Sequence, residues 1–171
     1  MAKFILGFLL ALLVIAGGGY LYLALGLAPV ATASAPMPFE TFLAKTALKK
    51  ALSREMPQVV PLTASEENFA AGAHSYRTFC AACHGLPGQP ETAIAKGEFP
   101  KPPQLFHDKG VSDDPPGETY WKIANGIRLT GMPAFRQSVA PEQMWQMSLL
   151  LANSDKLSAN VKAMLAAPPP Q

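Results

Sequence analysis

Two cysteines and a histidine within five residues are the side chains of this sequence best suited to chemistry. They form the stretch Cys80-Ala-Ala-Cys83-His84. Two thiols about one helical turn apart can each add to a vinyl group on one edge of a porphyrin, and the imidazole that follows can bind the iron from one face. The C-x-x-C-H spacing is the pattern of covalent haem attachment. We therefore expect one covalently bound haem c.

Other uses of the two cysteines fit the sequence less well. A redox-active disulfide would not need the histidine, and it would lie beside a βαβ pattern that the sequence lacks. The chain contains no further cysteine, so a zinc site would need His74 or His107, which stand at no recognised spacing. Two cysteines are also too few to stabilise a chain of 171 residues as a disulfide framework.

A second iron ligand must come from elsewhere in the chain, and Met132 is the residue we expect. A thioether is a soft ligand for iron. Met132 stands between Gly131, which allows the backbone to approach a porphyrin closely, and Pro133, which stiffens the loop.

Three other side chains compete with Met132 as the second ligand. Met144 and Met147 follow Pro141 in a segment with helical apolar spacing, where a methionine usually fills the core. His107 precedes the polar residues 108–110, and the sequence favours an exposed loop there.

The amino-terminal segment is apolar and long enough to cross a membrane. Residues 4–28 contain no Asp, Glu, Lys, Arg or His, and as a helix they would reach roughly 37 Å, against about 30 Å of hydrocarbon. A cleaved signal peptide is the alternative, with residues 4–16 as its apolar core, but the sites at Ala33 and Ala35 lie far downstream. With Lys3 on the cytoplasmic side, we expect a single-pass protein of a bacterial inner membrane whose remaining chain is periplasmic.

A connecting segment follows, in which an amphipathic helix of about 17 residues is expected between Phe39 and Met56. Glu40 lies near its start and basic side chains follow, which suits the helix macrodipole. Two interpretations remain open. The helix is a spacer with its apolar stripe on its own domain, or it lies on anionic headgroups or a partner subunit. The basic residues are Lys45, Lys49, Lys50 and Arg54.

The composition and net charge indicate which classes of molecule the protein could bind. The net charge is +2, and no cluster of lysine and arginine is interleaved with aromatic residues, so a nucleic-acid partner is not expected. Seventeen prolines indicate a segmented chain with proline-rich connections.

Residues 63–157 resemble the class I c-type cytochromes. Besides C-x-x-C-H, Gly72 and Tyr76 precede Cys80 by eight and four residues, where the family has a glycine and an aromatic residue at the crossing of its first and last helices. Further marks are a capping box at residues 63–66, a helix with a glycine cap at 118–126 and a last helix at 141–152 carrying Trp145 and Leu149.

The resemblance implies a role for each matching residue. Cys80 and Cys83 would form the thioethers, His84 would be the proximal ligand and Met132 the distal ligand. A backbone carbonyl within residues 100–105 would accept the other N–H of His84. Arg128 would bind a haem propionate or be solvated, and Trp121 and Phe135 would line the pocket.

The resemblance also implies an all-α fold, with a cytochrome c domain after one transmembrane helix and a linker. The expected parts are an anchor (1–28), a linker (29–62), a monohaem domain (63–157) and a tail (158–171), whose last residues, 166–171, we expect to be disordered.

The function implied is single-electron transfer between respiratory or photosynthetic redox proteins, without catalysis of its own. A fixed subunit of a larger membrane oxidoreductase is the alternative. A third possibility is a sensor or peroxidase whose methionine dissociates to open the iron.

Overall fold

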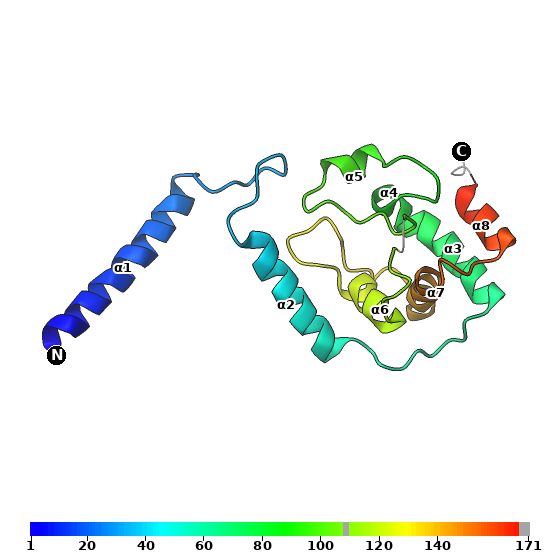
Figure 1. The fold of residues 1–171 in the computed structure, drawn as a ribbon, viewed down its shortest axis with the longest axis horizontal. Helices are drawn as coiled ribbons and strands as arrows, with labels where there is room; N and C mark the ends of the chain where they lie inside the picture. Colours follow the sequence, from blue (N-terminus) through cyan, green and yellow to red (C-terminus); the bar gives the residue numbers. More distant parts are fainter. Residues whose placement is uncertain (108–109, 168–171) are drawn as a thin grey trace. The chain divides into compact units, whose positions relative to one another are not determined.

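The computed structural model describes residues 1–107 and 110–167. Over these residues the fold is all-helical with no strand, which confirms the predicted fold class. The chain divides into two compact units, which meet between Thr41 and Phe42. Figure 1 shows the helices, which are α1 (Ala2–Ala24), α2 (Glu40–Glu55), α3 (Glu66–Phe79), α4 (Ala81–His84), α5 (Ala93–Gly97), α6 (Pro116–Asn125), α7 (Pro141–Ala152) and α8 (Ala159–Ala166).

The first unit contains α1, a helix of 23 residues with none of its side chains buried. Leucine, isoleucine, phenylalanine and alanine favour a helix here, and Lys3 is its only charged residue. Length and composition make α1 a candidate membrane span, a property that an N-terminal signal sequence shares.

The second unit begins on α2, which confirms that the connecting segment contains a helix, although Phe42 and Leu43 of the expected apolar stripe are exposed. Leu52 is buried, and Leu48 and Ala51 are half-buried on the same side. Pro57 ends the helix because the residue before a proline disfavours helical geometry. The carbonyl of Pro57 lies against Gly117, where no side chain would fit.

Helices α3 and α7 cross at the centre of the second unit, with α6 and α8 packed against them (Figure 1). The crossing is close because Gly72 lies directly on the backbone of Gln146, and a Cβ there would clash with the carbonyl of Gln146. Burial is complete around it, at Tyr76, Met144, Met147 and Leu150. The glycine crossing predicted from the sequence is therefore confirmed.

The start of α3 differs from the prediction. Thr63 was expected as the first residue of a capping box, but the helix begins at Glu66 and its N-cap is Ser65. The hydroxyl of Ser65 accepts the N–H of Asn68 at 3.3 Å, and the side chain of Asn68 donates to the carbonyl of Thr63 at 3.0 Å. Threonine and serine are both common N-cap residues. In this helix the cap is Ser65, whose hydroxyl pairs with a free N–H of the first turn.

Helix α8 lies in the segment that the sequence analysis assigned to a tail, and it was not foreseen. Its side chains Val161 and Leu165 are fully buried. The guanidinium of Arg77 donates to three carbonyls at the end of α8, which holds the helix against α3. Disorder was expected over 166–171, but Ala166 is the last residue of α8. Residues 168–171 lie outside the described residues.

Candidate haem site

The attachment motif occupies the junction of two helices. Cys80 ends α3, and α4 is a single turn in which the N–H groups of Cys83 and His84 donate to the carbonyl of Cys80 at 3.1 and 2.9 Å. Gly85 follows with φ of 71°, a left-handed conformation that favours glycine. The two cysteines and the histidine are thus presented by one short, hydrogen-bonded turn.

Both cysteines are free thiols. Cys80 Sγ lies 3.7 Å from the sulfur of Met147 in the core, and burial, with a smaller contribution from Cys83, raises the pKa of Cys80 to about 12. Cys83 Sγ donates to a carboxylate oxygen of Glu98 at 3.2 Å. Burial, followed by the contact with Glu98, raises the pKa of Cys83. Both sulfurs therefore carry a proton near neutral pH.

The imidazole of His84 is held by a backbone carbonyl. Its Nδ1 lies 2.8 Å from the carbonyl oxygen of Pro103. This contact makes Nδ1 the protonated nitrogen and leaves the lone pair on Nε2 for a metal. The carbonyl belongs to the 100–105 segment singled out from the sequence, so that prediction is confirmed and the acceptor is identified.

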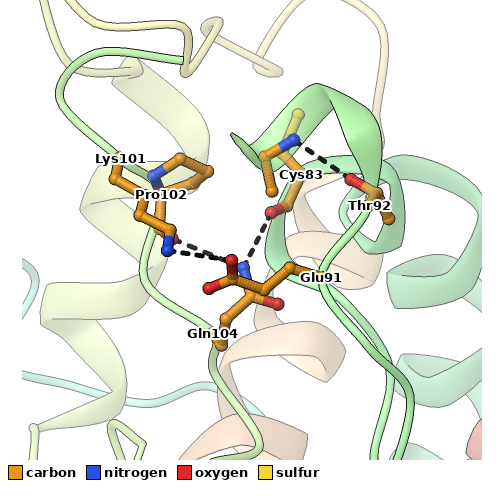
Figure 2. A network of polar contacts seen from close by, with 7 residues as sticks. Cys83, Glu91, Thr92, Lys101, Pro102 and Gln104 are labelled. Atoms are coloured by element: carbon orange, nitrogen blue, oxygen red, sulfur yellow. Dashed lines mark hydrogen bonds and ion pairs between the residues drawn. The ribbon is translucent and has the colours of Figure 1, made fainter. Parts of the chain in front are cut away.

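Side-chain amides and hydroxyls fix the loop that carries Pro103, as Figure 2 shows. Gln104 Nε2 donates to the carbonyls of Cys83 at 3.2 Å and Pro102 at 3.4 Å. Thr92 Oγ1 donates to the carbonyl of Ala82 at 2.5 Å. The loop is therefore attached to the cysteine motif on both sides of the residue that contacts His84.

Two further contacts stabilise the region around the attachment motif. The ammonium of Lys101 pairs with Glu91 at 2.8 Å (Figure 2). The buried hydroxyl of Tyr76 donates to the carbonyl of Gly85 at 2.9 Å, and burial raises the pKa of Tyr76. A neutral Tyr76 thus links α3 to the backbone immediately after His84.

Met132 lies in a loop that hydrogen-bonds to itself. The N–H of Ile127 donates to the carbonyl of Met132 at 3.2 Å, and the N–H of Met132 donates to the hydroxyl of Thr130 at 3.1 Å. Thr130 in turn donates to the carbonyl of Ile127 at 2.7 Å. The side chain of Met132 is half-buried and packs against the core. The loop therefore presents one sulfur from a fixed backbone.

Two contacts join the methionine loop to the attachment motif. The rings of Phe79 and Phe135 meet edge to face at a centroid distance of 6.0 Å. The carboxylate of Glu98, which accepts from Cys83, also lies against Gly131, within 3.0 Å of where a Cβ would stand. Sequence reasoning missed Glu98, because a single glutamate in a proline-rich loop carries no signal of position.

The competing methionines are part of the core. Met144 and Met147 are buried in α7, at 1% and 0% exposure, as the sequence predicted, and the sulfur of Met147 lies 3.7 Å from Cys80 Sγ. His74 and His107 are exposed. Residues 108 and 109, which the loop interpretation included, lie outside the described residues.

The resemblance also implied roles near the haem for three residues outside the ligand set. Arg128 is exposed, and Phe135 and Trp121 are half-buried. Phe135 contacts the end of α3, whereas Trp121 faces Glu55, whose pKa it helps to lower after the larger effect of Arg54.

The residues present fit a covalently bound haem. Two free thiols one turn apart, an imidazole whose Nδ1 is already used and a thioether in a stiff loop are the donor set of such a group. Thioether formation would remove the proton that Cys83 donates to Glu98, and with it the raised thiol pKa values. Across residues 1–107 and 110–167, no group of three or more His, Cys, Asp or Glu could hold a metal ion by itself.

Comparison with known proteins gives the following matches. Residues 67–149 match the family described as cytochrome c oxidase, cbb3-type, subunit III. The quinohemoprotein alcohol dehydrogenase ADH IIB of Pseudomonas putida is 30% identical over 97 residues, which cover 56% of this chain but 12% of that enzyme. In a solved structure, the reducing HAO-like protein complex of Kuenenia stuttgartiensis, one chain matches with a TM-score of 0.48 and 21% identity, over 61% of this chain and 54% of that one.

Proposed function

We propose that the chain contains a class I c-type cytochrome domain that binds haem c, and that it is a membrane-anchored monohaem carrier of single electrons between redox proteins on the periplasmic side of a bacterial inner membrane. The contact between His84 Nδ1 and the carbonyl of Pro103 carries the proposal, because it prepares Nε2 for iron beside two free thiols.

Four side chains would hold the group. Cys80 and Cys83 would form the thioethers to the porphyrin, and His84 and Met132 would be the iron ligands. When bound, the haem supplies reversible one-electron chemistry at a potential that methionine and histidine ligation raises. With both residues bound to the iron, no coordination site would remain for a substrate, so the chain would carry electrons without catalysing a reaction.

The remaining residues of the site fix these ligands. The carbonyl of Pro103 sets the orientation of the imidazole, and the hydroxyl of Thr130 sets the backbone of Met132. The edge-to-face contact of Phe79 and Phe135 joins the end of α3 to the segment that follows Met132.

Docking of partners would rest on exposed apolar side chains near the proposed ligands. Leu129, in the methionine loop, is 93% exposed, and Ile94 is 54% exposed on α5, which packs against α4. The net charge of +2 for the whole chain gives weak electrostatic steering. The membrane anchor compensates for this weak electrostatic attraction, because tethering keeps the domain at high effective concentration near membrane partners.

A second candidate function is a fixed electron-transfer subunit of a larger oxidoreductase. The matching family is described as an oxidase subunit, and the matching relative is a dehydrogenase of which this chain covers 12%. Extraction in mild detergent followed by sizing separates the two functions. Migration of the chain alone supports the carrier, and migration with a catalytic subunit supports the alternative.

A redox-titrated visible spectrum of the purified chain, matured with the haem-attachment machinery, tests the proposed chemistry. We expect one haem per chain, a one-electron titration and, in the oxidised form, the weak sulfur-to-iron absorption near the red end of the spectrum. Carbon monoxide should not bind the reduced form at neutral pH. A colourless preparation or rapid carbon monoxide binding contradicts the proposal.

A further inference from the structure

Helix α2 carries apolar side chains in two opposite directions. Leu48, Ala51 and Leu52 are buried or half-buried. At 3.6 residues per turn, Phe42 and Leu43 point to the other side, and they are 67% and 62% exposed. An ordinary amphipathic helix needs one apolar side, so these two exposed side chains require a separate explanation.

Basic side chains surround the exposed pair. Lys49 and Lys50 lie about two turns further along the same side, and Lys45 lies at its edge. All three lysines are exposed. Arg54 pairs with Glu55 at 2.6 Å, and Glu40, near the start of the helix, accepts the N–H of Met37 at 2.8 Å. We call Phe42, Leu43, Lys45, Lys49 and Lys50 the outer face of α2.

We propose that the outer face of α2 binds the anionic surface of the membrane that α1 spans. Phenylalanine and leucine flanked by lysines are typical of helices that lie in the headgroup region, where the rings and aliphatic chains enter the acyl boundary and the ammonium groups meet lipid phosphates.

The composition of the outer face favours lipid over a protein partner. Lysine is depleted in the buried parts of protein interfaces, and a stable interface needs about 800 Å² from each partner. Two apolar side chains among three lysines provide a small, strongly hydrated surface that matches phosphate groups better than a protein.

The chain itself keeps this face near lipid. Residues 25–39 connect α1 to α2 and, fully extended, reach at most about 50 Å. Once α1 is inserted, the outer face of α2 therefore remains at high effective concentration over the membrane surface. Binding there would hold the cytochrome domain close to the bilayer and restrict its search for partners to that surface.

Hydrogen exchange of the full-length holoprotein in nanodiscs tests the proposal. Amides of residues 40–50 should exchange about tenfold more slowly in discs that contain phosphatidylglycerol than in discs of phosphatidylcholine alone. Amides of α6 should exchange equally in both. Each disc should hold one copy of the chain, so that contacts between copies do not contribute.

Matched variants assign any protection to the outer face. The double variant Phe42→Ser and Leu43→Ser should lose the protection, and Lys49→Gln with Lys50→Gln should remove most of it, because each charge strengthens binding to anionic lipid by roughly fivefold. Val59→Ser is the control, because Val59 is 78% exposed but lies outside α2. All these side chains are exposed, so haem content should stay normal in every variant.

Two outcomes would overturn the proposal. The first is equal exchange of residues 40–50 in the two lipids. The second is protection that persists in detergent and rises with protein concentration, which would identify a protein as the occupant of the face.

Discussion

The crossed helices α3 and α7 differ in construction from the two loops that carry Met132 and the carbonyl supporting His84. The helices meet through fully buried side chains such as Met147 and Leu150, and Gly72 lets their backbones approach closely. In the loops, Pro102, which precedes Pro103, and Met132 are held by single hydrogen bonds to half-buried side chains. Stability should therefore depend mostly on the helices, and ligation of the iron mostly on the loops.

The largest expected effect is the loss of haem from His84→Ala. Without an imidazole after the two cysteines the iron loses its proximal ligand, and we expect little holoprotein to accumulate. Haem content per chain, measured as the pyridine haemochrome, checks this. His74→Ala is the control, because His74 is exposed on α3. Normal haem content in the His84 variant would contradict the assignment.

The next effect is electronic and comes from Met132→Ala. Haem should stay attached through the cysteines, but the sulfur-to-iron absorption of the oxidised protein should disappear. The reduction potential should fall on the order of 0.2 V, within the roughly 0.8 V that axial ligands set. Met37→Ala, a change at an exposed methionine, should leave the spectrum as it is. An unchanged absorption band in the first variant removes Met132 from its role.

Gly72→Ala tests the helices rather than the loops. A methyl group here clashes with the backbone of Gln146, so α3 and α7 must separate. We expect the free energy of unfolding of the holoprotein to fall by about 3 kcal/mol, measured by denaturant titration, with the visible spectrum retained. Gly97→Ala is the matched control, since nothing lies within 4 Å of a Cβ there. Equal stability of the two variants would show that the crossing tolerates a side chain.

The same contrast explains which features the sequence could predict. Helix α7 was expected at residues 141–152 and lies there, because apolar spacing and a proline at the first turn are local signals. The glycine at position 72 was recognised through the resemblance to the class I c-type cytochromes, which have a glycine eight residues before the first cysteine. The sequence does not show which distant segments bury one another's side chains. Helix α8, whose Val161 packs on the core, was missed for that reason.

The positions of the loop residues could be predicted only in part. The carbonyl that supports His84 was placed in a six-residue segment, but the choice of Pro103 depends on contacts made by Gln104 and Thr92. Each of these is one polar side chain meeting one backbone carbonyl. Such pairs leave no periodic pattern, and the same is true of Glu98 between Cys83 and the methionine loop.

The smallest expected effect comes from Gln104→Ala, which loosens the loop without removing a ligand. The amide of Gln104 holds the carbonyls of Cys83 and Pro102, the residue before the one that accepts from His84. A weaker hydrogen bond to the imidazole makes it a poorer electron donor, so the reduction potential should rise on the order of 30 mV. Potentiometric titration measures the shift.

Two further variants separate hydrogen bonding from packing at this position. Gln104→Glu keeps the shape of the side chain but cannot donate while it is ionised, so it should shift the potential at least as much as alanine. Gln137→Ala, at an exposed position, should not shift it. If Gln104→Glu retains the wild-type potential while Gln104→Ala does not, the side chain acts by filling space, and the hydrogen bonds to the loop carbonyls are not what orients His84.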